Sequence, residues 1–339
     1  MSSLPTITIA VDAMGGDFGP RVTVPACVRA LSFLPNVNFH LHGDQSLIEE
    51  QLQQIGSLPL ERITVMPASQ IIGMDEKPSQ SLRTKKDSSL FRAIESLADG
   101  RVQACVSAGN TGAMLAIGCY LLRTFPGIDR PAICTTVPTQ NGRCFLLDIG
   151  ANVNVHAENL RQFAVMGSVL AASLLHMEKP RVGLLNIGEE DIKGNEQIKL
   201  AAGLLRAEAS LNYVGFIEAD QVFFDGADVI VCDGFAGNIA LKAGEGVARL
   251  IAGKMRQVFD SALYAKMIGW FARPLLRIFH EQIDPARYNG ASFLGLQSTL
   301  VKSHGNADIH AFCHALEQAC FEARAGIPAL INKQLEHSL

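Results

Sequence analysis

Short runs of apolar residues recur along the chain, and most of them are continuous instead of alternating with polar residues. Continuous apolarity is typical of strands that are covered on both faces. Helical patterns lie between many of the runs, for example over residues 88–99, where Leu90, Ile94 and Leu97 share one stripe, and over residues 158–177. The predicted strands span residues 7–11, 37–42, 63–66, 104–107, 132–137, 144–149, 182–187, 213–217 and 228–233.

This alternation of strands and helices predicts the fold class. We expect an α/β protein with three α/β/α layers, in which helices cover both faces of an open, mostly parallel, Rossmann-like sheet. A single catalytic domain is expected over residues 1–339. Ligands of such sheets gather beyond the carboxyl ends of the strands, so the residues that follow the strands are the candidates for function.

Composition and charge narrow the classes of protein and partner. Hydrophobic residues make up 48% of the chain and charged residues 18%, which excludes disorder and fits a large buried sheet. The net charge of -4 gives no global attraction to nucleic acid, so no nucleic-acid partner is expected. Eight cysteines without a C-x-x-C pair, and the lack of a signal peptide or transmembrane pattern, predict a reduced, cytoplasmic protein.

Five of the predicted strands open into glycine-containing loops. Glycine lets backbone N–H groups approach a ligand, and a helix that starts just afterwards adds its positive end, so each loop could hold a phosphate oxygen. A tight strand-to-helix turn also needs glycine for structural reasons, which is the competing interpretation of any single loop. The loops begin at Asp12, Ser107, Asp148, Asn186 and Asp233.

Standard nucleotide and nucleophile motifs are missing from the sequence. It contains neither G-x-G-x-x-G after a strand, nor a Walker loop, nor a G-x-S-x-G elbow, so no cofactor is expected. His310 and His314 lie one helical turn apart, but the glutamate of an H-E-x-x-H zinc motif is absent between them. A polar helix face is favoured there, and no metal is expected.

Taken together, the loops resemble those of the phosphate acyltransferase (PlsX) family of bacterial phospholipid synthesis. The resemblance runs from Ile7 to about Ala325 and is carried by IAVDAMGGDFGP, DEKPSQSLRTKKDSS, ACVSAGNTGAM, GIDRPA, LLDIGAN, RVGLLNIGEEDIKGNE, VCDGFAGNIALK, YNGAS and VKSHG. It implies transfer of a long-chain acyl group from acyl carrier protein to inorganic phosphate, giving acyl phosphate for a membrane glycerol-3-phosphate acyltransferase. It also implies a homodimer with a fold similar to phosphotransacetylase and the isocitrate/isopropylmalate dehydrogenases.

The resemblance places the catalytic pair at Lys193 and Asn238. Hydrogen phosphate is already an oxygen nucleophile, so the site must mainly supply a cation and amide donors for developing negative charge. We expect Lys193 to pair with phosphate and Asn238 to donate to the tetrahedral oxyanion. The competing interpretations are a solvated loop lysine and a helix N-cap.

The phosphate cradle is predicted around the first two glycine loops. Asp12 and Asp17 cannot bind an anion, so we expect them to orient Lys193 or the loop amides. His304 is a candidate proton donor to the leaving thiolate, or a structural histidine. One departure from the family pattern is Asn154, which stands where an aspartate is common. The predicted phosphate- or substrate-binding residues are Asp12, Gly15, Gly16, Arg83, Lys85, Ser107, Gly109, Asn110, Thr111, Gly112 and His304.

A basic cluster is the candidate docking site for the partner protein. Acyl carrier protein is acidic and this chain is net negative, so docking needs local positive charge. Arg83, Lys85 and Lys86 form the densest cluster, although a solvated loop, or phosphate contacts of Arg83 and Lys85, are equal alternatives.

Residues 259–283 differ from the rest of the chain, because bulky apolar residues face a basic stripe. Pro274 interrupts the pattern, so two short amphipathic helices are expected. Such a hairpin suits a membrane interface, a second subunit or the protein's own core, and the resemblance favours peripheral membrane association and dimer contact. The predicted contact residues are Leu263, Met267, Trp270, Phe271 and Leu275.

Three other functions remain open alternatives. A phosphotransacetylase acting on acetyl-CoA would share the chemistry but have a small acyl pocket. A metal- and NAD-dependent dehydrogenase would need clustered aspartates and a nucleotide loop. A silent membrane scaffold would not need Lys193 and Asn238.

Overall fold

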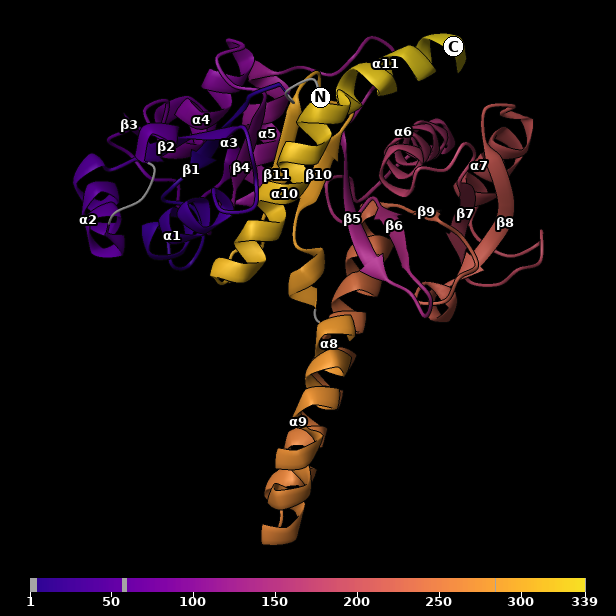
Figure 1. Ribbon diagram of the computed structural model, residues 1–339. Coiled ribbons are helices and arrows are strands. Elements are labelled where there is room, and N and C mark those ends of the chain that lie inside the picture. Colours follow the sequence, from indigo (N-terminus) through magenta and orange to yellow (C-terminus); the bar gives the residue numbers. More distant parts are fainter. Residues whose placement is uncertain (1–4, 57–59, 284, 339) are drawn as a thin grey trace.

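The strands of this computed structural model, which describes residues 5–56, 60–283 and 285–338, form one mixed sheet. The sheet has eleven strands in the order β3-β2-β1-β4-β11-β10-β5-β6-β9-β7-β8 (Figure 1). The strands are β1 (Ile7–Asp12), β2 (Val37–Gly43), β3 (Ile63–Pro67), β4 (Ala104–Ser107), β5 (Ala132–Pro138), β6 (Arg143–Leu147), β7 (Arg181–Asn186), β8 (Asn212–Glu218), β9 (Val229–Val231), β10 (Ala291–Leu294) and β11 (Thr299–Lys302). The expected α/β class with a mostly parallel sheet is confirmed.

Two strands that the apolar pattern did not predict, β10 and β11, lie in the middle of the sheet. β10 is antiparallel to both β11 and β5, and β5 is antiparallel to β6, whereas the strands on either side pair in parallel. The two parallel halves therefore run in opposite directions.

The strand register aligns the carboxyl ends of both halves along one row of paired residues across the sheet, which is referred to below as the level. Strands β1, β4 and β11 end one residue beyond this level, and strands β6 and β9 reach it from the opposite side and end on it. The candidate residues that follow the strands therefore approach this level from two opposite directions, because the sheet is not parallel throughout. The residues paired across the sheet at this level are Val11, Val106, Val301, Ser292, Cys134, Leu147 and Val231.

Helices cover the two faces of the sheet unequally. One face packs against α1, α2 and α10 in the first half and against α6, α7 and α11 in the second. The other face carries α4 and α5 on the first half, in one core with Ile133 of β5 and Phe293 of β10, and the start of α8 on the second half. The helices are α1 (Pro20–Ala30), α2 (Gln45–Ile55), α3 (Pro78–Thr84), α4 (Ser89–Ala98), α5 (Thr111–Leu121), α6 (Ala157–Leu175), α7 (Glu196–Ala207), α8 (Gly234–Asp260), α9 (Leu263–Ile283), α10 (Ile309–Ala325) and α11 (Ile327–Ser338).

Helices α8 and α9 form a long hairpin that points away from the sheet (Figure 1). The structure differs here from the two short helices expected within residues 259–283, because α9 continues through Pro274 and its partner is the far half of α8. Gly269 lets the two helices approach, since a Cβ there would lie 2.9 Å from the ring of Phe259. This packing offsets the backbone hydrogen bond that proline cannot make. In the described ranges, no helix is both long and apolar enough to span a membrane.

Candidate active site

A cavity of about 320 Å³ lies over β5 and β10, between the start of α5 and the first turns of α8. Its floor includes Ile133 and Thr135 of β5 and Ala291 of β10. Its walls come from both halves of the chain, because loops from both sets of carboxyl ends border it. Wall residues include Met74, Thr111, Gly150, Asn238, Lys302 and His304.

Lys302, the last residue of β11, is the buried cation of this cavity. Its neighbour Val301 faces the core beneath α10, so alternation along the strand turns Lys302 to the cavity face. The ammonium donates to the carbonyl oxygen of Ala108 at 3.2 Å and to that of Ser303. Burial lowers the pKa of Lys302 to about 8, and the negative charges of nearby aspartates oppose this shift. Sequence reasoning missed this residue, although a lysine that ends an apolar strand was a usable signal.

Behind Lys302, the first two glycine loops pack against each other around Asp12. The Ser107 hydroxyl donates to Asp12 Oδ2 at 2.6 Å and accepts from the Gly109 amide at 2.9 Å. A Cβ at Gly15 would lie 2.6 Å from the same carboxylate oxygen, so glycine is required for this close approach. Burial raises the pKa of Asp12, and the charge of Lys302 opposes that rise. Asp12 therefore holds the glycine loops through Ser107, which fits the expectation that it orients the loop amides, and its charge also favours the protonated form of Lys302.

The glycines at positions 16, 109 and 112 also serve packing. Gly16 has a φ of +86° and approaches the carbonyl of Gly305, whose oxygen accepts from the Asp17 amide at 2.8 Å. A Cβ at Gly109 would lie 3.0 Å from Ser107 Oγ, and one at Gly112 only 2.7 Å from the ring of Pro78. The two glycine loops are a rigid support beside the cavity, and these glycines do not line it.

Asn110 fixes the start of α5 at the cavity edge. Its Oδ1 accepts from the Ala113 amide at 3.0 Å, and its Nδ2 donates to the carbonyls of Met74 and Glu76 at 2.9 and 3.0 Å. These bonds occupy the side chain and hold residues 73–76 against the helix. The next residue, Thr111, lines the cavity, so the positive end of α5 lies beside it.

Asn238 enters the cavity from the opposite side, on the second turn of α8. The N-cap of this helix is Asp233, whose carboxylate accepts from the Ala236 amide at 2.7 Å, so the interpretation of Asn238 as a cap is wrong. Asn238 is half-buried, and within the described residues its side chain has no hydrogen-bond partner. Its Nδ2 lies 3.0 Å from where a Cβ of Gly150 would stand.

The loop that faces Asn238 is held by one buried carboxylate. Asp148 accepts from the amides of Ile133, Gly150 and Ala151 at 3.0–3.1 Å and from that of Asn152 at 2.6 Å. Burial raises the pKa of Asp148, and these hydrogen bonds oppose the rise. The backbone that faces the Asn238 amide is therefore preorganised.

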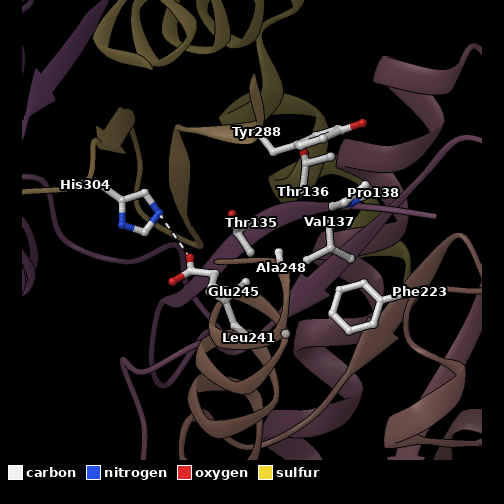
Figure 2. A pocket seen from close by; sticks show the side chains of 11 residues that line it. Thr135, Thr136, Val137, Pro138, Phe223, Leu241, Glu245, Ala248, Tyr288 and His304 are labelled. Carbon is white, nitrogen blue, oxygen red and sulfur yellow. Dashed lines mark ion pairs between the residues drawn. The ribbon is translucent and has the colours of Figure 1, made fainter. Parts of the chain in front are cut away.

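His304 borders the cavity at the side nearest α8. Its Nε2 lies 3.7 Å from Glu245 Oε1, as Figure 2 shows, and its backbone amide donates to Asn289 Oδ1 at 2.9 Å. Partial burial lowers the pKa of the imidazole, Glu245 opposes this and Lys302 adds to it. The lowered pKa makes His304 a weaker proton donor candidate, and its part in protonating the thiolate stays a prediction.

The remaining predicted site residues lie outside the cavity. Lys193 is exposed in the loop after β7, and Arg83 is exposed at the end of α3. Lys85 forms an ion pair with Glu76 and donates to the carbonyl of Ile71 at 2.5 Å. The structure thus brings Thr111, Asn238 and His304 together and adds Lys302. Among the residues described, no cluster of three or more potential metal ligands is found.

Comparison with known proteins gives a consistent result. The family model described as "Fatty acid synthesis protein" matches residues 7–329. Phosphate acyltransferases of Pseudomonas fluorescens (strain Pf0-1) and Pseudomonas aeruginosa (strain UCBPP-PA14) are each 53% identical over 331 residues, which cover 98% of both chains. Among solved structures, a phosphotransacetylase from Streptococcus pyogenes superposes with a TM-score of 0.63 at 15% identity and covers 94% of each chain, which shows a shared fold.

The residues that line the cavity predict a binding site for an anion, and its affinity should depend on the positive charge of Lys302. Lys302→Met is expected to weaken binding of inorganic phosphate at neutral pH by about tenfold to a hundredfold, the range for losing one hydrogen bond to a charged group. Binding to the unaltered protein should weaken as the pH rises through about 8, because Lys302 then loses its proton. Isothermal titration calorimetry measures both effects. Lys254→Met, at an exposed position on α8, is the control, and equal affinity of the two variants would contradict the assignment.

Proposed function

The chain belongs to the fatty acid synthesis protein family and transfers acyl groups to phosphate, and from this we propose that its donor is the thioester of acyl carrier protein. The observation that supports this cavity as the active site is the meeting of Lys302, Asn238 and the start of α5 across the sheet. A cation, a free amide and a helix N-terminus are the groups that an attacking dianion and a developing oxyanion require.

In the proposed reaction, Lys302 and the start of α5 hold phosphate beside the thioester carbonyl. A phosphate oxygen attacks the carbonyl carbon, and the Asn238 amide donates to the oxyanion that forms. The new C–O bond stays in the acyl phosphate, the C–S bond breaks, and the thiolate takes a proton from solvent. No general base is needed, because the dianion is already a nucleophile.

Lys193 is proposed as a second cation that acts from the neighbouring loop. β7 pairs with β9, so the loop that carries Lys193 begins beside the turn that leads to Asn238. The exposure of Lys193 suits a group that meets phosphate only when the donor is bound.

The reaction is tested by trapping acyl phosphate with hydroxylamine and detecting the hydroxamate by mass spectrometry. Palmitoyl-acyl carrier protein plus phosphate should give palmitoyl hydroxamate, and omission of phosphate should abolish it. Asn238→Ala should lower kcat by about 10²–10³, as loss of an oxyanion donor does. Asn212→Ala, an exposed asparagine on β8, is the control. Product from acetyl-CoA alone would indicate a phosphotransacetylase, and none from either donor would favour the scaffold.

The proposed docking surface for acyl carrier protein is formed by the exposed Arg83 and Lys86. Lys85 lies between them, but its charge is already paired with Glu76. Arg83→Glu with Lys86→Glu should raise the KM for the carrier protein severalfold at low salt, with a difference that shrinks as salt screens the charges. Lys199→Glu with Lys333→Glu, two exposed lysines elsewhere, is the matched control. An unchanged KM would place docking on another surface.

The proposed contact with the membrane or a second subunit is the hairpin of α8 and α9. Leu263 is 88% exposed, and Met267, Trp270, Phe271 and Leu275 are exposed with it. Covering this apolar surface would stabilise a homodimer or a peripheral attachment that delivers acyl phosphate to a membrane glycerol-3-phosphate acyltransferase.

Trp270→Ser with Phe271→Ser is expected to abolish flotation with vesicles of anionic phospholipid, because the change removes two adjacent, exposed aromatic rings of α9. Phe33→Ser with Tyr120→Ser removes two exposed aromatic rings elsewhere and should leave flotation unchanged. Sedimentation equilibrium of the same variants reports the dimer. Unchanged flotation together with unchanged dimerisation would exclude the hairpin from both contacts.

A further inference from the structure

The active cavity continues into two further hollows along α8. A narrow passage of about 60 Å³ shares Thr135, Leu241 and His304 with the cavity (Figure 2). Beyond it lies a groove of about 910 Å³. The passage and the groove share Pro138, Phe223, Gly244, Ala248 and Tyr288. The three hollows therefore adjoin one another in a row along α8, called the path below, and the row begins at the catalytic groups.

Along α8, the wall of the path changes from polar to apolar. The cavity presents Lys302 and Asn238, whereas the α8 wall of the groove is small and aliphatic, and polar residues such as Gln140, Asp220 and Arg287 lie on the other walls. From Asn238 to the far groove residue Ile251, the helix rises about 20 Å at 1.5 Å per residue. The residues of α8 and α9 that line the groove are Ala240, Ala243, Gly244, Val247, Ala248, Ile251 and Phe279.

The narrow passage is shaped by a glycine. A Cβ on Gly244 would lie only 2.3 Å from the ring of Phe223, so the ring rests against the bare backbone of α8. At about 60 Å³ the passage is too small for a folded segment of another protein, and Val137, Leu241 and Ala248 give it an apolar wall beside the polar Glu245 and His304.

We propose that this passage and groove hold the acyl chain of the donor, with its thioester at Asn238 and its methyl end toward Ile251. The inference rests on the proposed function and assigns to α8 the choice of acyl length. Each methylene that enters the groove leaves water, so long chains gain binding free energy that short chains lack. The length of the path matches an extended long-chain acyl group and greatly exceeds an acetyl group.

The test uses a variant that narrows the path and measures how kcat/KM depends on the length of the acyl chain. Ala248→Phe adds a ring where the passage meets the groove, and Gly246→Phe adds the same ring two residues away, where a Cβ meets open space. With carrier-protein thioesters from butyryl to palmitoyl, Ala248→Phe should lower kcat/KM for palmitoyl by about tenfold or more and leave butyryl nearly unchanged. Gly246→Phe should keep the original profile.

A second variant marks the far end of the path. Ile251→Asp should penalise only the longest chains, so its cutoff should lie at a greater acyl length than that of Ala248→Phe. An unchanged profile in both variants would overturn the proposal, and a changed dimer dissociation constant in sedimentation would then show that a second copy covers the groove. Equal loss at every chain length would also overturn it.

Binding of palmitate, followed by calorimetry, separates failure of the groove from failure of the proposed function. Palmitate binding that Ala248→Phe weakens, in a protein without transferase activity toward any acyl donor, would keep the groove and reject the function. If the protein has transferase activity but Ala248→Phe does not affect palmitate binding, the function is kept and the groove is rejected as the acyl site.

Discussion

The reversal of strand direction at β5 and β10 is the constraint on which the site depends. In an open parallel sheet, all carboxyl ends lie along one edge, and a ligand binds where neighbouring connections diverge. Here the two parallel halves run toward each other, and the pairing of Ser292 with Val301 and Cys134 sets the level at which they meet. The helices that follow each half start at this level and lie apart, so the strands between them form the floor of a cavity. This geometry brings Thr111 from the first half and Asn238 from the second half into one site.

The electrostatics of the site follow from the same arrangement. Burial of an ammonium group is costly, and Lys302 is tolerated because two carbonyls and the neighbouring carboxylates surround it. The glycine loops, with Ser107 and Asp12 at their centre, provide the rigid wall against which this charge is held. On the far side, Asp148 accepts hydrogen bonds from the amides of Ala151 and Asn152 and so fixes the backbone opposite Asn238. Lys302 from one half and Asn238 from the other thus face the cavity, and a buried carboxylate on each side, Asp12 or Asp148, fixes the surroundings.

The sequence predicted the strands that carry strong apolar runs, and it predicted the helix over residues 88–99 almost to the residue, because Ser88 is a good N-cap. It did not predict β10 and β11, which have four residues each and lie among turn residues, and so it could not predict the reversal of direction. The register of central strands is a long-range property that no local pattern contains. For the same reason the local sequence predicts phosphate cradles at the glycine loops without showing which distant segments these loops contact. The glycines of the first two loops accommodate close contacts between chain segments about 95 positions apart, as the bond between Asp12 and Ser107 shows.

The late position of β10 and β11 in the chain has a consequence for how the protein is made. During synthesis, β4 can pair with β1 and β5 with β6, but the other edge of each strand stays open until β10 and β11 follow after residue 290. Closing a sheet over so long a loop is entropically costly and slow, and exposed edges invite wrong pairing meanwhile. The last part of the chain thus joins the two halves and supplies the buried lysine in one step. A nascent or truncated chain that lacks β11 cannot form a continuous sheet, and it also lacks Lys302. Completion of the fold and assembly of the active site therefore occur together.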